Sequence, residues 1–330
     1  MRKVGLILLS LSVAGIVTAQ SQPPAPPAQA TQPAPAGPPP TEIYVAALAV
    51  SGTTWTVGKP ENISNSPGYD NQPFFLPDGS GVLFTSDRTQ PSSRVLLKDT
   101  TPAASGIQEV TMPRQTDIYR YDLGSRQVSR VIGSPESEYS PTVTPDGQGI
   151  SVIRVERDQT QRLWRFTRTG ERAAVIFADI KPVGYHAWLD GQTIAMFVLG
   201  QPATLQVADT RTGTPQLVAS DIGQSVQRIP SGGVSFVQQG GKEPMISRLV
   251  IQDGKPVTTP LITPVPGARQ AHLAWTPDGM LLMAHSGWLH AWKPGDTAWR
   301  GVADLDALGL KGVTRLAVSP KGDRLAIVAQ

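Results

Sequence analysis

The sequence predicts an all-β protein: a six-bladed β-propeller of four-stranded antiparallel blades, with the last blade closed by strands from both termini. Three observations predict this fold. A Pro-Asp-Gly type of turn recurs six times, its copies have the spacing of propeller blades, and each end of the chain supplies half of a repeat.

The recurring turn has the sequence TPDG at Thr144–Gly147. It returns unchanged at Thr276–Gly279 and, with one difference, at Leu76–Gly79; weaker copies stand at Trp188–Gly191, Ile229–Gly232 and Ser319–Gly322. Proline presets φ at the first central position of a tight turn, Asp or Ser bonds to the local backbone, and Gly adopts the left-handed conformation that returns the chain. Because apolar segments flank every copy, each copy predicts a hairpin of two short, buried strands.

A second hairpin with alternating apolar and polar residues follows each turn hairpin, as in DIYRYDLGSRQVSRVI at 117–132. The turn positions Pro77, Pro145, Leu189, Pro230, Pro277 and Pro320 are separated by 68, 44, 41, 47 and 43 residues. Four of these five intervals match a four-stranded blade, which takes about 40–50 residues. The long interval contains an insertion at 89–115. The sequence leaves open whether this insertion folds over one face as a lid or docking loop, or is disordered.

The two ends of the repeat region are offset. The chain enters it with a second hairpin, Glu42–Val57, and ends with a first hairpin, Thr314–Ala329. Together these halves make a sixth blade, and the resulting closed ring has no exposed sheet edge between blades. The alternative, an open array of β-sandwich type, does not need offset ends.

The N-terminal part predicts export. Arg2 and Lys3 precede an apolar run from Val4 to Val17, and Val17–Ala19 fits a cleavage site, so residues 1–19 are expected to be a signal peptide rather than a buried helix. Residues 20–41 are rich in Pro and Ala and are expected to be a disordered linker, or else a target for a proline-recognising partner. Residues 42–330 form the predicted propeller. The expected location is the periplasm or the exterior, with no integral membrane segment after cleavage of the signal.

Composition narrows the possible partners. The net charge is +3, of which Arg2 and Lys3 account for two (3 − 2 = +1), so the rest of the chain has no basic excess for nucleic acid. The sequence has no cysteine, which excludes disulfides, thiol catalysis and cysteine-zinc sites.

The repeat resembles that of the TolB-like propellers. The segments PGYDNQPFFLPDG, EYSPTVTPDG and VGYHAWLDG carry the likeness, which extends from Glu42 to Gln330. TolB is the periplasmic propeller of the Tol-Pal system, and related repeats occur in exported binding proteins, oligopeptidases and polysaccharide lyases. The resemblance therefore implies an exported propeller but several functions. In place of the α/β domain that precedes the propeller in TolB, this chain has the Pro/Ala-rich segment.

Sequence motifs for catalysis are absent. Gly-x-Ser-x-Gly, Gly-x-x-x-x-Gly-Lys and His-Glu-x-x-His do not occur, so no catalytic residue, cofactor or metal is predicted. The preferred hypothesis is a noncatalytic, monomeric module that binds an envelope protein or a polar ligand. The alternative is a lyase or hydrolase, with or without assistance from a metal, that acts on a polar polymer at the channel mouth.

Polar side chains precede the predicted innermost strands, where the chain enters the central channel. The candidate ligand-binding residues are Tyr69, Asp70, Asn71, Glu138, Tyr139, Tyr185, His186, Gln270, His272 and Arg315. Such residues suit a polar ligand or a peptide end, or they cap strands and bond neighbouring blades. His186 and His272 differ in their distance from the turn of their own repeat, which argues against one shared metal site.

Overall fold

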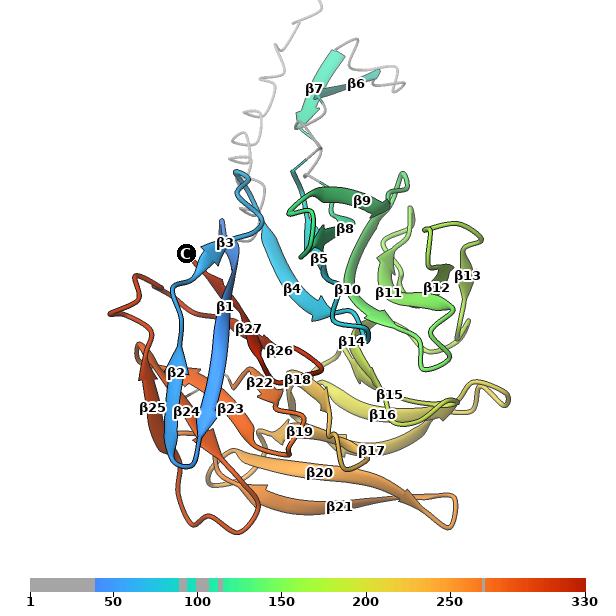
Figure 1. Cartoon of the computed structure of the whole chain (residues 1–330). Helices are drawn as coiled ribbons and strands as arrows, with labels where there is room; N and C mark the ends of the chain where they lie inside the picture. The colour runs from blue at the N-terminus through green and yellow to red at the C-terminus, as the bar shows by residue number, and fades with distance from the viewer. Residues whose placement is uncertain (1–38, 89–93, 99–106, 112–114, 269–270) are drawn as a thin grey trace, which may run out of the picture. The chain divides into compact units, whose positions relative to one another are not determined.

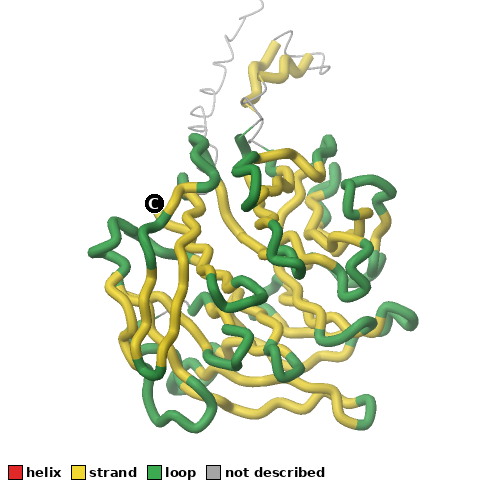
Figure 2. Tube along the Cα trace, viewed as in Figure 1, coloured by secondary structure: helices red, strands yellow, loops and turns green. Residues whose placement is uncertain are grey.

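The computed structural model describes residues 39–88, 94–98, 107–111, 115–268 and 271–330. Six antiparallel sheets account for nearly all of the regular structure, and no helix occurs among these residues (Figures 1 and 2). None of the described segments forms an apolar helix long enough to traverse a bilayer.

Five of the sheets are built from consecutive parts of the chain, and each runs in order from the innermost to the outermost strand. The first contains β4 (Asp70–Phe75), β5 (Gly81–Ser86), β8 (Asp117–Asp122) and β9 (Val128–Ile132). The second contains β10 (Ser137–Val143), β11 (Gly149–Val155), β12 (Gln161–Thr167) and β13 (Ala174–Val175). The third contains β14 (Val183–Trp188), β15 (Thr193–Val198), β16 (Thr204–Asp209) and β17 (Gln216–Ser220). The fourth contains β18 (Ile222–Arg228), β19 (Val234–Gln238), β20 (Met245–Gln252) and β21 (Lys255–Ile262). The fifth contains β22 (Leu273–Trp275), β23 (Leu281–His285), β24 (Trp288–Trp292) and β25 (Arg300–Asp304).

The sixth sheet joins the two ends of the described chain. It contains β26 (Arg315–Val318), β27 (Arg324–Ala329), β1 (Glu42–Ser51) and β2 (Thr54–Val57), and β3 (Glu61–Asn62) also pairs with β1. Six residue pairs, from Glu42↔Ala329 to Ala47↔Arg324, connect β1 with β27. The predicted closure by strands from both ends is confirmed.

The hydrophobic core is divided into six clusters, and each cluster fills the junction between two neighbouring sheets. Ile43 and Phe84 share the cluster between the sixth and first sheets, and Leu282 and Leu325 share the one between the fifth and sixth. Six junctions among six sheets leave no open end, because an open array of six sheets would have only five. The inner strands β4, β10, β14, β18, β22 and β26 therefore lie around the centre of a ring, as Figure 1 shows. The six-bladed propeller is confirmed.

The recurring turn has the predicted chemistry. Gly147 adopts a φ of +69°, and its N–H donates to the Thr144 carbonyl over 2.8 Å. The carboxylate of Asp146 accepts a hydrogen bond from the N–H of Gln148 over 3.0 Å. Gly79, Gly279 and Gly322 have the same left-handed conformation in their own copies.

Two predicted segments fall wholly or largely outside the described residues. The signal peptide (1–19) lies outside them, as does the linker (20–41) except for its last residues. Within the insertion at 89–115, β6 (Arg94–Lys98) and β7 (Ile107–Thr111) form a two-stranded antiparallel sheet, which the sequence did not predict.

Candidate functional site

A cavity of about 500 Å³ lies between the inner strands of the propeller. All six inner strands contribute to its lining. Pro77, Pro145, Pro230, Pro277 and Pro320 of the recurring turns also line it, and all five are exposed. The cavity therefore opens on the side of the ring where the inner strands end in these turns. Its volume is within the range of about 300–1,000 Å³ that is usual for small-ligand sites.

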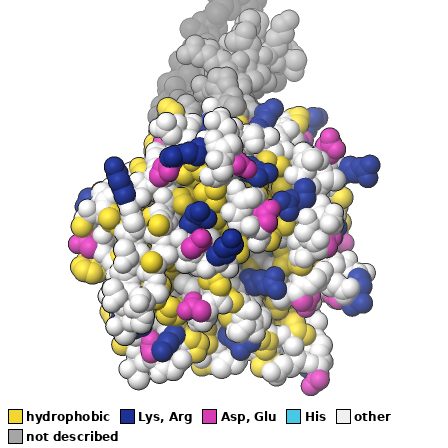
Figure 3. All heavy atoms as spheres, in the orientation of Figure 1, with side chains coloured by type: hydrophobic (Ala, Val, Ile, Leu, Met, Phe, Trp, Pro, Cys, Tyr) yellow, Lys and Arg dark blue, Asp and Glu magenta, His cyan; other side chains and the backbone are white. Residues whose placement is uncertain are grey.

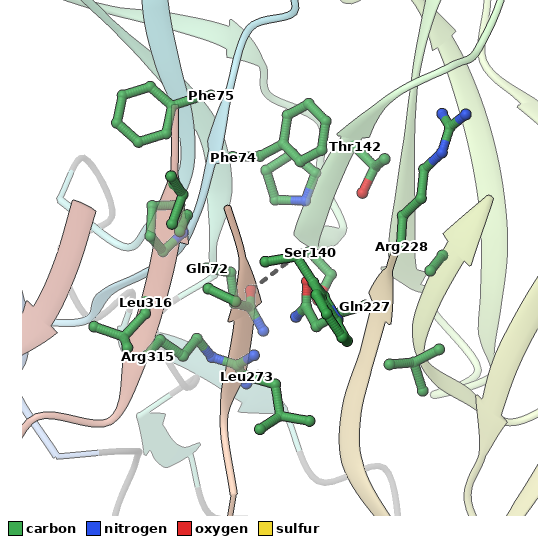
Figure 4. Close-up of a pocket in the computed structure, with 18 of the residues that line it drawn as sticks. Gln72, Phe74, Phe75, Ser140, Thr142, Gln227, Arg228, Leu273, Arg315 and Leu316 are labelled. Carbon is green, nitrogen blue, oxygen red and sulfur yellow. Dashed lines mark hydrogen bonds between the residues drawn. The ribbon is translucent and has the colours of Figure 1, made fainter. Parts of the chain in front are cut away.

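The floor of the cavity is formed by one position of the repeat, five residues before the turn. Gln72, Ser140, His272 and Arg315 occupy this position in four blades and line the cavity. Gly184 and Ser225 occupy it in the other two blades, where Tyr185 and Gln224 beside them complete the lining. Figure 4 shows Gln72, Ser140 and Arg315 converging from three different inner strands. We call this set the floor.

Two floor residues are held in an unusual backbone conformation. Gln72 has a φ of +57° and Ser140 a φ of +55°, and the pairing of both inner strands shifts register at these residues. The Gln72 Oε1 atom accepts hydrogen bonds from the Ser140 N–H (2.9 Å, dashed in Figure 4) and the Thr85 hydroxyl (2.7 Å). Bulges and left-handed non-glycine residues redirect side chains and concentrate at functional sites. Here the bulges turn the backbone and the side chains of Gln72 and Ser140 toward the channel.

Above the floor, the position three residues before the turn forms a middle layer. Its members are Phe74, Thr142, His186, Gln227, Ala274 and Ala317, and all of them line the cavity. The layer is mostly small or apolar, whereas the floor is polar in five of its six positions. Because side chains two residues apart share a face of a strand, both layers face the channel, apart from the local shifts at the bulges.

His186 is held by a buried hydrogen-bond network. The Ser151 hydroxyl lies 2.7 Å from the His186 Nε2 atom and accepts a hydrogen bond from the Trp188 Nε1–H over 3.0 Å. Burial lowers the pKa of His186 to about 3, so the imidazole is neutral at pH 7. An equivalent pair, the Trp275 Nε1–H and the Ser235 hydroxyl (2.9 Å), lies two blades further on. This repetition indicates that Ser151 and Trp188 connect neighbouring blades.

At the inner end of the cavity, a hydrogen bond crosses the channel. The Arg315 Nη2 atom donates to the Tyr185 hydroxyl over 3.0 Å, and the Arg315 guanidinium carbon lies 4.9 Å from the centroid of the Tyr185 ring. These residues belong to the sixth and third blades, which are three blades apart in either direction around the ring. The pair therefore spans the full width of the channel.

Tyrosines and a neutral histidine surround this crossing. Burial raises the pKa of Tyr69 to about 12, an effect that Arg315 opposes and Tyr185 reinforces. Tyr139 also has a pKa raised by burial and by the charges of Tyr185 and Tyr69. Burial, assisted by Arg315, lowers the pKa of His272 to about 3. At neutral pH the Arg315 guanidinium is thus the single charged group of the floor.

The cavity lining carries positive charge without negative charge. It includes Arg228, which is exposed near the opening, and Arg315 at the floor, and none of its residues, all of them described, is Asp or Glu. No described carboxylate lies within ion-pair distance of either arginine. On the face of the molecule that Figure 3 shows, basic and acidic side chains are interspersed.

The candidate residues of the sequence analysis occupy three environments. Tyr69, Tyr139, Tyr185, His272 and Arg315 influence one another at the inner end of the channel, and His186 lies in the middle layer. Asp70, Asn71 and Glu138 are buried away from the cavity. Gln270 lies outside the described residues.

The three buried candidates have partners of their own. The Arg88 Nη2 atom donates to the Asp70 carboxylate over 3.0 Å, and the Asn71 amide oxygen accepts from the Gln72 N–H over 2.8 Å. Glu138 has no exposed surface, and its carboxylate lies 3.2 Å from the Arg154 Nε atom. Burial raises the pKa of Glu138 to about 7. The contacts of Asp70 and Glu138 join neighbouring segments of one blade, and the Asn71 contact lies within its own strand.

Sequence reasoning missed Gln72, Gln227, Arg228 and the apolar walls. A signal for Gln72 existed: counting five residues back from each turn proline reaches Gln72, Ser140, His272 and Arg315 together. Within the described residues, no group of three or more His, Asp or Glu side chains is arranged to hold a metal ion.

Comparison with known proteins shows that solved structures share the fold of this chain. No family model matches the sequence, and no curated protein matches it. A protein assigned as TolB from Agrobacterium tumefaciens is similar in structure, with a TM-score of 0.61 and 14% identity over 88% of this chain and 98% of the other. TolB from Acinetobacter baumannii gives 0.54 and 12% over 88% of this chain and 64% of the other. An oligogalacturonate lyase in complex with manganese gives 0.51 and 12% over 82% and 79%.

At these identities the similarity concerns the fold alone, and proteins of different function share it. The function of this chain must therefore be argued from its own cavity. The described chain has the fold of a TolB-like six-bladed β-propeller.

Proposed function

We propose that this protein is an exported, noncatalytic propeller that binds a protein or a polar ligand of the cell envelope in its central cavity. The observation that carries the proposal is the composition of the cavity. Polar and cationic groups form its floor, apolar side chains line its walls, and the lining holds no carboxylate to act as a general base.

The hydrogen-bonding groups of the cavity suit binding. Among the described residues, the side chains of Gln224, Gln227 and Arg228 have no hydrogen-bond partner, and Arg315 bonds only to Tyr185. These groups are donors and acceptors for a ligand within a fixed frame of six strands. Export is proposed from the signal-like residues 1–19, and cell fractionation of the full chain with and without them tests it.

Blocking the cavity tests the binding function. Ala317 lies in the middle layer, is only partly buried, and packs on one side against the core cluster shared by the sixth and first sheets. Ala317→Trp places a large side chain in the channel, and circular dichroism checks that the variant is folded. Val50 on β1 is 40% exposed, so Val50→Trp is the matched control outside the cavity. We expect the tagged full chain and the control to capture the same partner from envelope extract, and the blocked variant to lose it. Equal capture by all three folded proteins would remove the cavity from the function.

A second candidate function is a lyase or hydrolase that acts on a polar polymer. It is supported by the shared fold of the oligogalacturonate lyase and by two neutral imidazoles, His186 and His272, in one cavity lining. Incubation of the full chain with polygalacturonate and Mn²⁺ tests it, by the absorbance of unsaturated product for a lyase and by new reducing ends for a hydrolase. Turnover that disappears in His272→Ala would favour this function over the noncatalytic one.

A further inference from the structure

The geometry points to a more specific ligand: the cavity binds the free C-terminal end of an extended peptide, with the terminal carboxylate on Arg315. This inference rests on the proposed binding function and adds the chemical class of the ligand. Arg315, Tyr185, His272 and Gln72 form the end of the site that receives the carboxylate.

Arg315 carries a positive charge that no described carboxylate compensates. Its guanidinium bonds to a neutral hydroxyl and stacks on an aromatic ring, and no described carboxylate pairs with it. His272 beside it is neutral at pH 7 because burial lowers its pKa to about 3. A partly buried arginine without an anion is a site for an anion, and its planar fork of N–H groups suits a carboxylate in particular. With a single positive charge at the floor, a monoanion fits better than a phosphate dianion.

The depth of the cavity matches the length of a short extended peptide. Five residues of an inner strand separate the floor from the turn prolines at the opening, which corresponds to roughly 16 Å at about 3.3 Å per residue. An extended peptide of four or five residues has the same length. Its carboxylate would reach Arg315, while Arg228 near the opening attracts the negatively charged end.

The walls of the cavity are largely apolar. Phe74, Ala317 and Val318 are partly exposed in the lining, and the five turn prolines surround the opening. Apolar walls suit the side chains at the end of a peptide. Sugar acids carry hydroxyl groups on all sides and need acceptors such as carboxylates, which this lining does not contain. The observations therefore favour a peptide over an oligouronide.

A peptide library tests the inference. The full chain is probed against tetrapeptides immobilised by their N-termini, one set with free carboxyl ends and one amidated, with trigalacturonate in solution as competitor. We expect binding to the free-carboxyl set with a preference for apolar last residues, and about 10- to 100-fold weaker binding to the amidated set because a charge-assisted hydrogen bond is lost. Binding should weaken with added salt.

Three substitutions assign the effect to Arg315. Arg315→Gln should abolish the difference between free and amidated peptides. Arg300→Gln removes an exposed arginine from β25, outside the lining, and should keep the difference. Tyr185→Phe removes the hydroxyl that bonds to Arg315 but keeps the ring, so it should preserve the preference for free carboxylates.

The possible outcomes separate this inference from the proposed function. Equal binding of free and amidated peptides, or binding of trigalacturonate where no peptide binds, overturns the assignment of a peptide carboxylate to Arg315. If no peptide binds but the Ala317→Trp variant still loses its envelope partner, the binding function stands and the inference fails. If the blocked variant keeps that partner as well, both fail.

Discussion

Removing the last strand should unfold the whole ring, because β27 is the strand that joins the two ends. Ending the chain after Asp323 deletes β27, in which Leu325 to Ala329 have no exposed surface. The deletion also breaks six residue pairs with β1 and four with β26. Truncation of a buried Leu or Ile to Ala costs about 2–5 kcal/mol, so Leu325 and Ile327 alone represent about 4–10 kcal/mol. The net stability of a typical protein is about 5–15 kcal/mol. The deletion should therefore remove most or all of it.

Circular dichroism melting of the purified full chain and of the truncated chain measures the effect. We expect the truncated chain to have no cooperative transition. Ile327→Ala gives a graded version, with a loss of about 2–5 kcal/mol and a melting temperature lower by roughly 5–15 °C. Leu217→Ala is the control: Leu217 on β17 is 64% exposed, and its loss should change stability by less than about 0.5 kcal/mol. A truncated chain that melts cooperatively within about 2 °C of the full one would refute closure by β27.

Two further predictions concern buried polar groups. Burial raises the pKa of Glu138 from 4.5 to about 7, so this group stabilises the fold below pH 4.5 and the contribution is lost as pH rises toward 7. In urea titrations, the stability of Glu138→Gln relative to the natural chain should therefore increase from pH 5 to pH 8. A constant difference in stability would contradict the assignment. Ser151→Ala leaves both His186 and Trp188 without a hydrogen-bond partner, whereas Ser235→Ala leaves only Trp275 without one. The first variant should lose about 1–3 kcal/mol of unfolding free energy, and more than the second. Chemical denaturation measures both losses, and the reverse order would be inconsistent with the network.

The fold could be predicted because its determinants are local and repeated. The turn around Gly147 contains a left-handed glycine, and the corresponding turns of four other blades contain one at Gly79, Gly232, Gly279 and Gly322, so the same signal recurs along the sequence. The offset ends of the chain then led to the closure through Glu42↔Ala329. The pairing of β6 with β7 was not predicted, because no recurring turn marks that hairpin.

The site was predicted only in part, because side-chain direction at the inner strands depends on bulges. Asn71 was chosen from the sequence, yet the register shift after it turns Gln72 to the cavity and leaves Asn71 buried. Burial decides whether other candidate side chains can reach a ligand. Glu138 looks like an exposed acid in the sequence, but it lies with no exposed surface beside Arg154. Neither the bulge nor the burial has a signature in a single sequence.

The repeat itself explains why the fold and the function are carried by different residues. The turns and the apolar faces that build the ring are similar from blade to blade, so they give the cavity its opening and its apolar walls but do not distinguish one side of it from another. The floor position, five residues before each turn, is free of that requirement, and it holds Gln, Ser, Gly, Ser, His and Arg in the six blades. A symmetric floor of six arginines or six glutamates would repel itself in a closed channel. One arginine among neutral groups instead makes one end of the cavity positively charged. The cross-channel hydrogen bond from Arg315 to Tyr185 holds that charge at the centre. The asymmetry of this single layer therefore places a positive charge at one end of a symmetric scaffold, which is the basis of the proposed carboxylate site.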